Sequence, residues 1–462
     1  MTLVVTLAAA GATGADVSAV GGKGASLGEL ARAGIAVPPG FVVTVEAFAA
    51  TMAAVDPSGA HRASVEALDA GDLAGIAAVA ARLRALITEA PLPEEVAAAI
   101  SSGYTALGTD AAASASAGAA DVAGADADVA VRSSATVEDS AEASFAGLQD
   151  TYLGVSGAPS VLGYVRRCWA SLYNDESVAY RRRLGLPEAG VAMAVVVQRM
   201  VAPRAAGVMF TRSPVTGDRS VVAIEGTWGL GSALVSGDVT PDSWVISKIT
   251  REITSRRVSP KAKVHRYIQN GGLPSPAPSP AAREEPGAPR PAADSDAGEP
   301  TTAGSEPTAS DGRPTASDGE PTAAGSAPAL AGGEPTAAGG GEPTASAPSE
   351  LGWVTVSDTP AELRDAPCLT DDEIRALAAV ARRVEAHYGT PQDIEWAILD
   401  APFTQDASAA PAGSAADVPA EARVVLLQSR PETVWAAREA TPAGAPKPRA
   451  ADHVLALFGK PL

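Results

Sequence analysis

The chain has 462 residues but only two cysteines, Cys168 and Cys368, which are far apart and form no CxxC pair. A disulfide framework or a cysteine-based zinc site is therefore not expected, and a reducing cytoplasm fits this composition. No apolar run reaches the roughly 18–20 residues that a membrane-spanning helix needs. The apolar N-terminus has no Lys or Arg before Lys23, which favours a first strand at Leu3–Leu7 over a signal peptide.

Basic residues are also scarce, because 35 Lys and Arg face 54 Asp and Glu and leave a formal net charge of −19. Such a balance disfavours nucleic acid and anionic membrane surfaces as partners.

Residues 268–350 lack almost every residue type that builds a core. They hold twelve acidic residues, three arginines and no lysine, with a loose GEPTA-like repeat and no aromatic residue. A segment of this kind cannot bury enough apolar surface to fold. We predict a disordered insert that loops out of the fold.

Near the C-terminal end, PQDIEWAILD and ARVVLLQSRPET both alternate in the manner of half-buried strands. If they pair as an antiparallel hairpin, one face collects polar groups and the other is apolar. The residues expected on the polar face are Asp393, Glu395, Ala397, Leu426, Gln428 and Arg430. Carboxylate and amide oxygens suit Mg²⁺, and a neighbouring guanidinium suits phosphate. Taken alone, the pattern also fits a solvated hairpin face.

The segment VSAVGGKGASLGELARAGIAV predicts a glycine-rich turn, a helix at about Ala25–Ala33 and an end at Gly34. Backbone N–H groups before a helix can approach an anion, and Lys23 adds a positive charge. A plain turn with an exposed lysine is the alternative. The spacing does not match a Walker loop.

The stretch DVAVRSSATVEDS predicts a short strand at Val129–Val131 that delivers Arg132 to a loop rich in hydroxyl groups. An arginine in this position can clamp a phosphate. Thr136 and Asp139 have the spacing of a helix capping box, which is an alternative explanation for the hydroxyl and acidic residues.

Three apolar runs, VAMAVVVQRMV, AAGVMFTRSP and SVVAIEGTW, predict strands of an antiparallel or mixed sheet with one covered face. The edge of the first run could hold a purine, although core packing of Met200 also explains it. CLTDDEIRALAAVARRVEAHYGT predicts a helix with a Thr370–Glu373 capping box and Gly389 past its end.

In this order, several motifs resemble the nucleotide-binding domain of the phosphoenolpyruvate synthase and pyruvate phosphate dikinase family. They are VGGKGASLGEL, VRSSATVEDSAEASFAGLQDTYL, VVVQRMV with GVMFTRSP, GTWGLGSALVSGDVTPD, and HYGTPQDIEWAI with LLQSRPETVW. Rifampicin phosphotransferase and phenylphosphate synthase carry similar domains. The resemblance implies an α+β ATP-grasp fold in which two subdomains clamp ATP. It places the first subdomain at 1–190, the second at 191–267 and 351–436, and a tail at 437–462.

The resemblance also implies a binding site for ATP and Mg²⁺, with roles for specific residues. Lys23 and Arg132 would contact the phosphates, and Gly147 and Thr151 would line a lid over them. Gln198, Met200 and Val201 would form the hinge beside adenine. Glu395 and Gln428 would hold Mg²⁺, with Asp393 close by and Arg430 on the terminal phosphate.

Family members use ATP twice and leave AMP, passing one phosphoryl group to a histidine on a mobile domain, as in pyruvate, water dikinase. The four histidines here are His61, His265, His387 and His453, and none has the glycine-rich sequence context of that phosphohistidine. The resemblance therefore implies an ATP-binding subunit that needs a separate histidine-bearing partner. The alternative is a nucleotide-sensing module that binds ATP without turnover.

Overall fold

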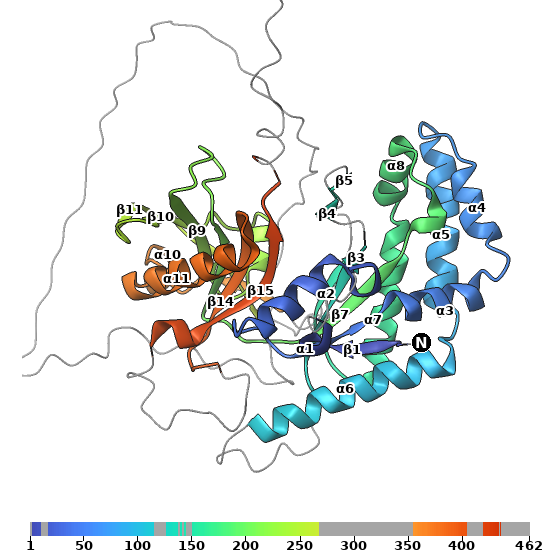
Figure 1. The fold of residues 1–462 in the computed structure, drawn as a ribbon, viewed down its shortest axis with the longest axis horizontal. Helices are drawn as coiled ribbons and strands as arrows, with labels where there is room; N and C mark the ends of the chain where they lie inside the picture. The colour runs from blue at the N-terminus through green and yellow to red at the C-terminus, as the bar shows by residue number, and fades with distance from the viewer. Residues whose placement is uncertain are drawn as a thin grey trace, which may run out of the picture. The chain divides into compact units, whose positions relative to one another are not determined.

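The computed structural model describes residues 2–10, 17–114, 126–136, 139–140, 143–144, 150–267, 354–403, 419–433 and 435. These residues all fall within one compact unit, and the predicted α+β architecture is confirmed (Figure 1). The insert predicted at 268–350 and the tail predicted at 437–462 lie outside the described residues.

The first sheet has five antiparallel strands in the order β1-β2-β7-β3-β6. Their bounds are β1 Val4–Thr6, β2 Gly40–Val43, β3 Val129–Ala135, β6 Thr151–Val155 and β7 Met193–Arg199. Alternate residues of β7 enter two different cores: Val195 and Val197 join one, and Ala194 and Val196 join the other. Burial on both faces explains why β7 is apolar throughout instead of alternating.

One face of this sheet is covered by helices of the N-terminal half, whose apolar stripes form a core with Phe41, Val129 and Trp169. These helices are α3 Val45–Val55, α5 Leu73–Glu89, α6 Glu94–Ser114 and α7 Ala158–Ala170. Shorter elements surround them: α1 Leu7–Ala10, α4 Ala60–Glu66, η1 Ser171–Tyr173, α8 Asp175–Leu184 and η2 Glu188–Gly190.

The second sheet has six antiparallel strands in the order β11-β10-β9-β8-β14-β15. Their bounds are β8 Ala205–Phe210, β9 Val221–Trp228, β10 Asp242–Ser247, β11 Ile253–Arg257, β14 Gln392–Ile398 and β15 Val424–Pro431. The helix α11, Asp371–Tyr388, packs on one face with Ile224, Ile394 and Trp396. The other face carries the polar residues of β9, β14 and β15.

The helix α11 begins and ends as its sequence predicts. Thr370 Oγ1 accepts a hydrogen bond from the Glu373 backbone N–H, and the Glu373 side chain accepts one from the Thr370 backbone N–H. Gly389 follows the helix in the left-handed conformation, with φ of 70°. Both predicted helix boundaries are therefore confirmed.

A two-stranded ribbon flanks the predicted insert, with β12 at Lys263–Tyr267 and β13 at Val354–Asp358. Tyr267 pairs directly with Val354, so the chain leaves and re-enters the fold at neighbouring positions. The remaining short elements are β4 Asp139–Ser140, β5 Ala143–Ser144, α9 Ser232–Val235, α10 Ala361–Arg364 and η5 Ala420–Arg423.

Two expectations about strand organisation were wrong. The three apolar runs do not share one sheet, because β7 belongs to the first sheet whereas β8 and β9 belong to the second. The strand expected at Val129–Val131 extends to Ala135, so Ser133 and Ser134 lie in a strand and are buried. Asp139 begins strand β4, and a helix cap at Thr136 is therefore excluded.

The N-terminal helix also differs from its prediction. It spans Val17–Arg32 as α2, with a bend at Gly21, where φ is 68°. Lys23 therefore lies inside a helix just after a kink, rather than in a turn before the helix. Within the described parts of the chain, no helix is long and apolar enough to span a membrane.

Candidate functional site

Arg132 of β3, in the first sheet, reaches the polar face of the second sheet. Its Nη2 atom donates to Glu395 Oε2 at 2.9 Å and to Gln428 Oε1 at 3.0 Å. Its Nη1 atom donates to the carbonyl oxygen of Leu427 at 2.6 Å. The side chain of Arg132 is only 10% exposed, so these contacts replace most of its hydration. The structure thus brings together three of the predicted site residues.

The strands β14 and β15 pair antiparallel, as predicted, and their polar residues face one another. Glu395 lies opposite Gln428, and Asp393 lies opposite Arg430. A bulge follows between Glu395 and Trp396, which shifts the alternation of β15 at Leu427. As a consequence, Leu426 lies opposite Trp396 in the core covered by α11, and its predicted place on the polar face was wrong.

Lys23 is buried against the strand that carries Arg132. Its Nζ atom donates to the carbonyl oxygen of Ser133 at 2.5 Å. The backbone N–H of Gly24 donates to Ser134 Oγ at 3.0 Å, so this N–H group is already used inside the protein. A Cβ atom at Gly21 would lie 2.0 Å from the Ser134 carbonyl oxygen, and only glycine allows this close approach. The GGKG motif therefore places the lysine amine beside β3.

The predicted adenine hinge contains one buried and two half-buried residues. Gln198 Nε2 donates to the Pro38 carbonyl oxygen at 3.1 Å, and its Oε1 atom is 3.5 Å from Arg132 Nη1. Met200 packs beside Leu230, and its backbone N–H donates to the Asp128 carbonyl oxygen at 2.9 Å. Val201 packs instead against the small core around Ala206, Ala397 and Val425.

Of the two predicted lid residues, Thr151 lies opposite Arg132 at the start of β6 and is exposed. Gly147 lies outside the described residues.

Asp393 carries an unusual electrostatic environment. Its Oδ2 atom is 3.7 Å from Arg430 Nε, whereas its buried Oδ1 atom has no hydrogen-bond partner among the described residues. Burial raises the pKa of Asp393 to about 6; the positive charge of Arg430 opposes this increase and the negative charge of Glu432 adds to it. A cation bound beside this buried carboxylate would stabilise its ionised form.

Three further charged residues near this site were not predicted from the sequence. Arg212 Nη1 lies 3.8 Å from Glu432 Oε2, next to Asp393. Glu225 of β9 lies in line with Glu395, because both pair with Val208 of β8 from opposite sides. The alternation of SVVAIEGTW could have placed Glu225 on the polar face, whereas the pairing of Arg212 with Glu432 depends on contacts between distant segments.

The donor set fits a magnesium ion. Glu395 Oε2 and Gln428 Oε1 both lie within about 3 Å of one positively charged nitrogen, which shows that both oxygens already converge on a cation. Within the described ranges, no group of three or more His, Cys, Asp and Glu side chains could hold a metal. Mg²⁺ typically takes one or two protein carboxylates and completes its shell with water and substrate phosphates, so a sparse set of oxygens is suitable.

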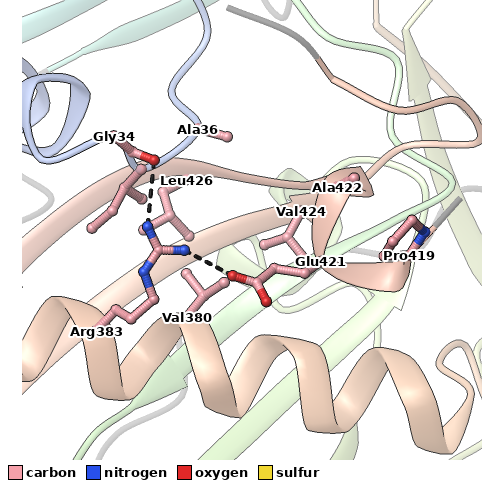
Figure 2. A pocket seen from close by; sticks show the side chains of 10 residues that line it. Gly34, Ala36, Val380, Arg383, Pro419, Glu421, Ala422, Val424 and Leu426 are labelled. Atoms are coloured by element: carbon pink, nitrogen blue, oxygen red, sulfur yellow. Dashed lines mark hydrogen bonds and ion pairs between the residues drawn. The ribbon is translucent and has the colours of Figure 1, made fainter. Parts of the chain in front are cut away.

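A cavity of about 320 Å³ lies away from these residues, beside α11, η5 and the Gly34–Ala36 segment. Figure 2 shows Arg383 at its rim, bonded to Glu421 at 2.7 Å and to the Gly34 carbonyl oxygen at 3.4 Å. Its lining includes Val380 and Leu426 but none of the predicted site residues. This cavity is therefore separate from the predicted site residues.

Comparison with known proteins shows the family of the chain. The family model described as pyruvate phosphate dikinase, AMP/ATP-binding domain, matches residues 17–284 and 343–450. A rifampicin phosphotransferase of Streptomyces is 37% identical over 392 residues, covering 84% of this chain and 34% of that protein. A probable phosphoenolpyruvate synthase of Methanothermobacter thermautotrophicus is 35% identical, covering 83% of this chain and 42% of that protein.

A phosphoenolpyruvate synthase of Pyrococcus furiosus is 31% identical over 478 residues, covering 96% of this chain and 45% of that protein. The chain thus spans less than half the length of these curated relatives. The α+β architecture and the matched family together indicate the ATP-grasp fold. The chain belongs to the family of the pyruvate phosphate dikinase AMP/ATP-binding domain.

Proposed function

We propose that this chain is the ATP-binding component of a dikinase-type phosphotransferase. It cleaves ATP to AMP and passes a phosphoryl group to a histidine on a separate partner protein. Its paired acceptors would resemble pyruvate and water, as in pyruvate, water dikinase. The observation that carries this proposal is the convergence of Arg132, Glu395 and Gln428 from two sheets on one point. Family membership supports it.

In this proposal Glu395 and Gln428 would hold Mg²⁺, which would supply positive charge to the phosphate oxygens. Arg132 exchanges its contact with Glu395 for a phosphate oxygen when the nucleotide arrives. Lys23 and Arg430 add positive charge beside the transferring group, and Asp393 lies next to the metal ligands. Phosphoryl transfer needs mainly positioning and charge stabilisation, which these side chains can supply.

The remaining predicted residues bind the rest of the nucleotide. Gln198, Met200 and Val201 form the wall beside adenine. Since the Met200 N–H donates to the Asp128 carbonyl oxygen, an adenine in this position would use other groups of this segment. Gly147 and Thr151 cover the phosphates.

A separate acceptor is proposed because none of the four histidines has the glycine-rich sequence context of the family's phosphohistidine, and two of them have other side-chain contacts. His265 is buried, with Nδ1 3.0 Å from Ser232 Oγ and Nε2 3.1 Å from Asp238 Oδ2. His387 lies on the surface, 3.0 Å from Glu29 Oε1. His453 lies outside the described residues, and His61 lies in α4. The partner is proposed to be a mobile histidine-bearing subunit in the same cytoplasmic compartment.

The proposal is tested by incubating the chain with Mg·ATP, with and without a histidine-bearing domain prepared from a full-length relative. AMP that forms only with this domain, together with an acid-labile phosphoryl group on it, is the expected result. Glu395→Gln and Arg430→Ala should abolish AMP formation. Tight ATP binding without AMP in either mixture would instead favour a nucleotide-sensing module.

A further inference from the structure

A second cavity, of about 230 Å³, lies between α11 and the turn that joins β10 to β11. Its floor is apolar and includes Val222, Ile246 and Ala378. These strand residues belong to the α11 side of the second sheet, whereas Glu225 and Glu395 belong to the opposite side. The sheet therefore separates this cavity from the proposed nucleotide site.

Four basic side chains line the cavity: Lys248, Arg251, Arg375 and Arg382. No acidic residue is among its lining residues. A cluster of four cations is unexpected in a chain with a formal net charge of −19. Because like charges repel one another, neighbouring anions stabilise such a cluster.

Two of the four cations are compensated by carboxylates of the protein. Lys248 Nζ lies 2.6 Å from Glu385 Oε2, and Arg375 Nη1 lies 3.1 Å from Asp372 Oδ1. Both carboxylates, Glu385 and Asp372, belong to α11, and neither is among the residues that line the cavity.

The other two cations have no carboxylate partner in the described part of the chain. Arg382 Nε makes one long hydrogen bond of 3.4 Å, to the Ala378 carbonyl oxygen. Arg251 is exposed and follows the β10 strand with a positive φ of 63°. Two guanidinium groups that line one cavity therefore lack a carboxylate partner among the residues that the structure describes.

We propose that this cavity binds a small phosphate monoester. Its phosphate group would lie between Arg251 and Arg382, and its short apolar portion would lie on Ile246 and Ala378. A phosphate monoester carries nearly two negative charges near neutral pH and several acceptor oxygens, which match two guanidinium groups better than one carboxylate does. The cavity is smaller than the roughly 300–1,000 Å³ of drug-sized sites, so the ligand is smaller than a nucleotide.

The experiment uses the full chain and butyl phosphate as the probe, titrated by calorimetry at low ionic strength. Inorganic phosphate tests the charge alone and butanol tests the apolar portion alone; both should bind more weakly than butyl phosphate. Saturating Mg²⁺ with a non-hydrolysable ATP analogue should not displace the probe. Displacement would place the probe in the nucleotide site and overturn this inference without affecting the proposed function.

Variants separate the two parts of the cavity. Arg251→Ala combined with Arg382→Ala should weaken butyl phosphate binding by about tenfold or more, because both charge-assisted contacts to the phosphate group are lost. Arg183→Ala, at an exposed position in α8, is the control for charge and should not change binding. Ala379→Leu, which fills the half-buried floor and keeps every charge, should also weaken it.

Circular dichroism establishes that each variant is folded. Butyl phosphate affinity that stays unchanged in both the double variant and Ala379→Leu would overturn the proposal, as would the absence of measurable binding to the wild-type chain.

Discussion

Arg132 illustrates how a single side chain can prepare a site for a highly charged ligand. Its guanidinium is almost fully buried, and three oxygens from β14 and β15 replace its hydration. Two of these oxygens are the ones proposed to hold Mg²⁺. Because the arginine and the metal need the same oxygens, the arrival of Mg·ATP would release Arg132 toward the phosphates. The site is therefore held together before the ligand binds.

Asp393 leads to a prediction about pH. Its pKa is about 6 in the folded chain and should return toward 3.8 on unfolding, so the folded state binds the proton more tightly. This contribution to stability is fully present below pH 3.8 and is lost as the pH rises through about 6. The ionised form is destabilising at higher pH by on the order of 2–3 kcal/mol. The nearby charged groups are Arg430, Glu432 and, beyond Glu432, Arg212.

Asp393→Asn should therefore raise the free energy of unfolding relative to wild type at pH 8, and this gain should shrink steadily as the pH falls from about 7 to 4. Urea denaturation of the Mg²⁺-free chain at several pH values measures it. A difference that does not depend on pH would contradict the account of Asp393.

Gly21 gives a second residue-scale prediction, with Gly34 as its matched control. Both have positive φ, 68° and 69°, but a Cβ at Gly21 would meet the Ser134 carbonyl oxygen, whereas one at Gly34 would meet nothing within 4 Å. Gly34→Ala should cost only backbone strain, about 1 kcal/mol. Gly21→Ala should cost more, at least about 2–3 kcal/mol, because strain and steric overlap add. If urea denaturation shows the same decrease in the free energy of unfolding for both variants, the close approach of Gly21 to β3 does not contribute to stability.

At the scale of single elements, patterns with a local cause were predictable. The α11 boundaries follow from Thr370, Glu373 and Gly389, since a capping box and a left-handed glycine act within a few residues. The polar face of β14 follows from a period of two. The bulge at Leu427 was not predictable, because it arises only when β15 pairs with β14.

The capping box yields an element-scale prediction. Thr370→Ala removes the acceptor for the Glu373 backbone N–H and should lower the free energy of unfolding by about 1 kcal/mol. Thr370→Ser keeps that acceptor and should stay close to wild type. Thermal and urea denaturation of both variants measure the effect, and a Ser variant as unstable as the Ala variant would argue against the cap.

At the scale of the whole molecule, the sequence did not predict how distant segments assemble. The burial of Ser133 and Ser134 depends on Lys23 and Gly24, more than one hundred residues earlier, which supply their hydrogen-bond partners. Likewise, β7 joins the first sheet because β2 and β3 flank it. Its apolar run resembles those of β8 and β9, so composition alone could not separate them.

The pairing of Tyr267 with Val354 predicts that residues 268–353 can be replaced by a two-residue Asn-Gly turn. A shorter loop loses less conformational entropy when its ends are brought together. The free energy of unfolding should therefore stay equal or rise by up to about 3 kcal/mol. Nucleotide affinity should not change.

A matched deletion that also removes Tyr267 shifts the register and loses its hydrogen bond to Asp128, and it should be less stable. Replacing residues 268–353 should therefore be less harmful than this control. If both changes destabilise the chain equally, the pairing of β12 with β13 does not by itself hold the two ends of the insert together.

The account depends most on the proposal that Glu395 holds the metal that binds ATP. The most direct test is calorimetric titration of the full chain with a non-hydrolysable ATP analogue, with and without Mg²⁺. The wild-type chain should bind the nucleotide more tightly with Mg²⁺, and Glu395→Gln should lose most of that difference. Glu421→Gln, which changes a carboxylate paired with Arg383 at a different cavity, should keep it. An unchanged Mg²⁺ effect in Glu395→Gln would contradict the assignment of this site.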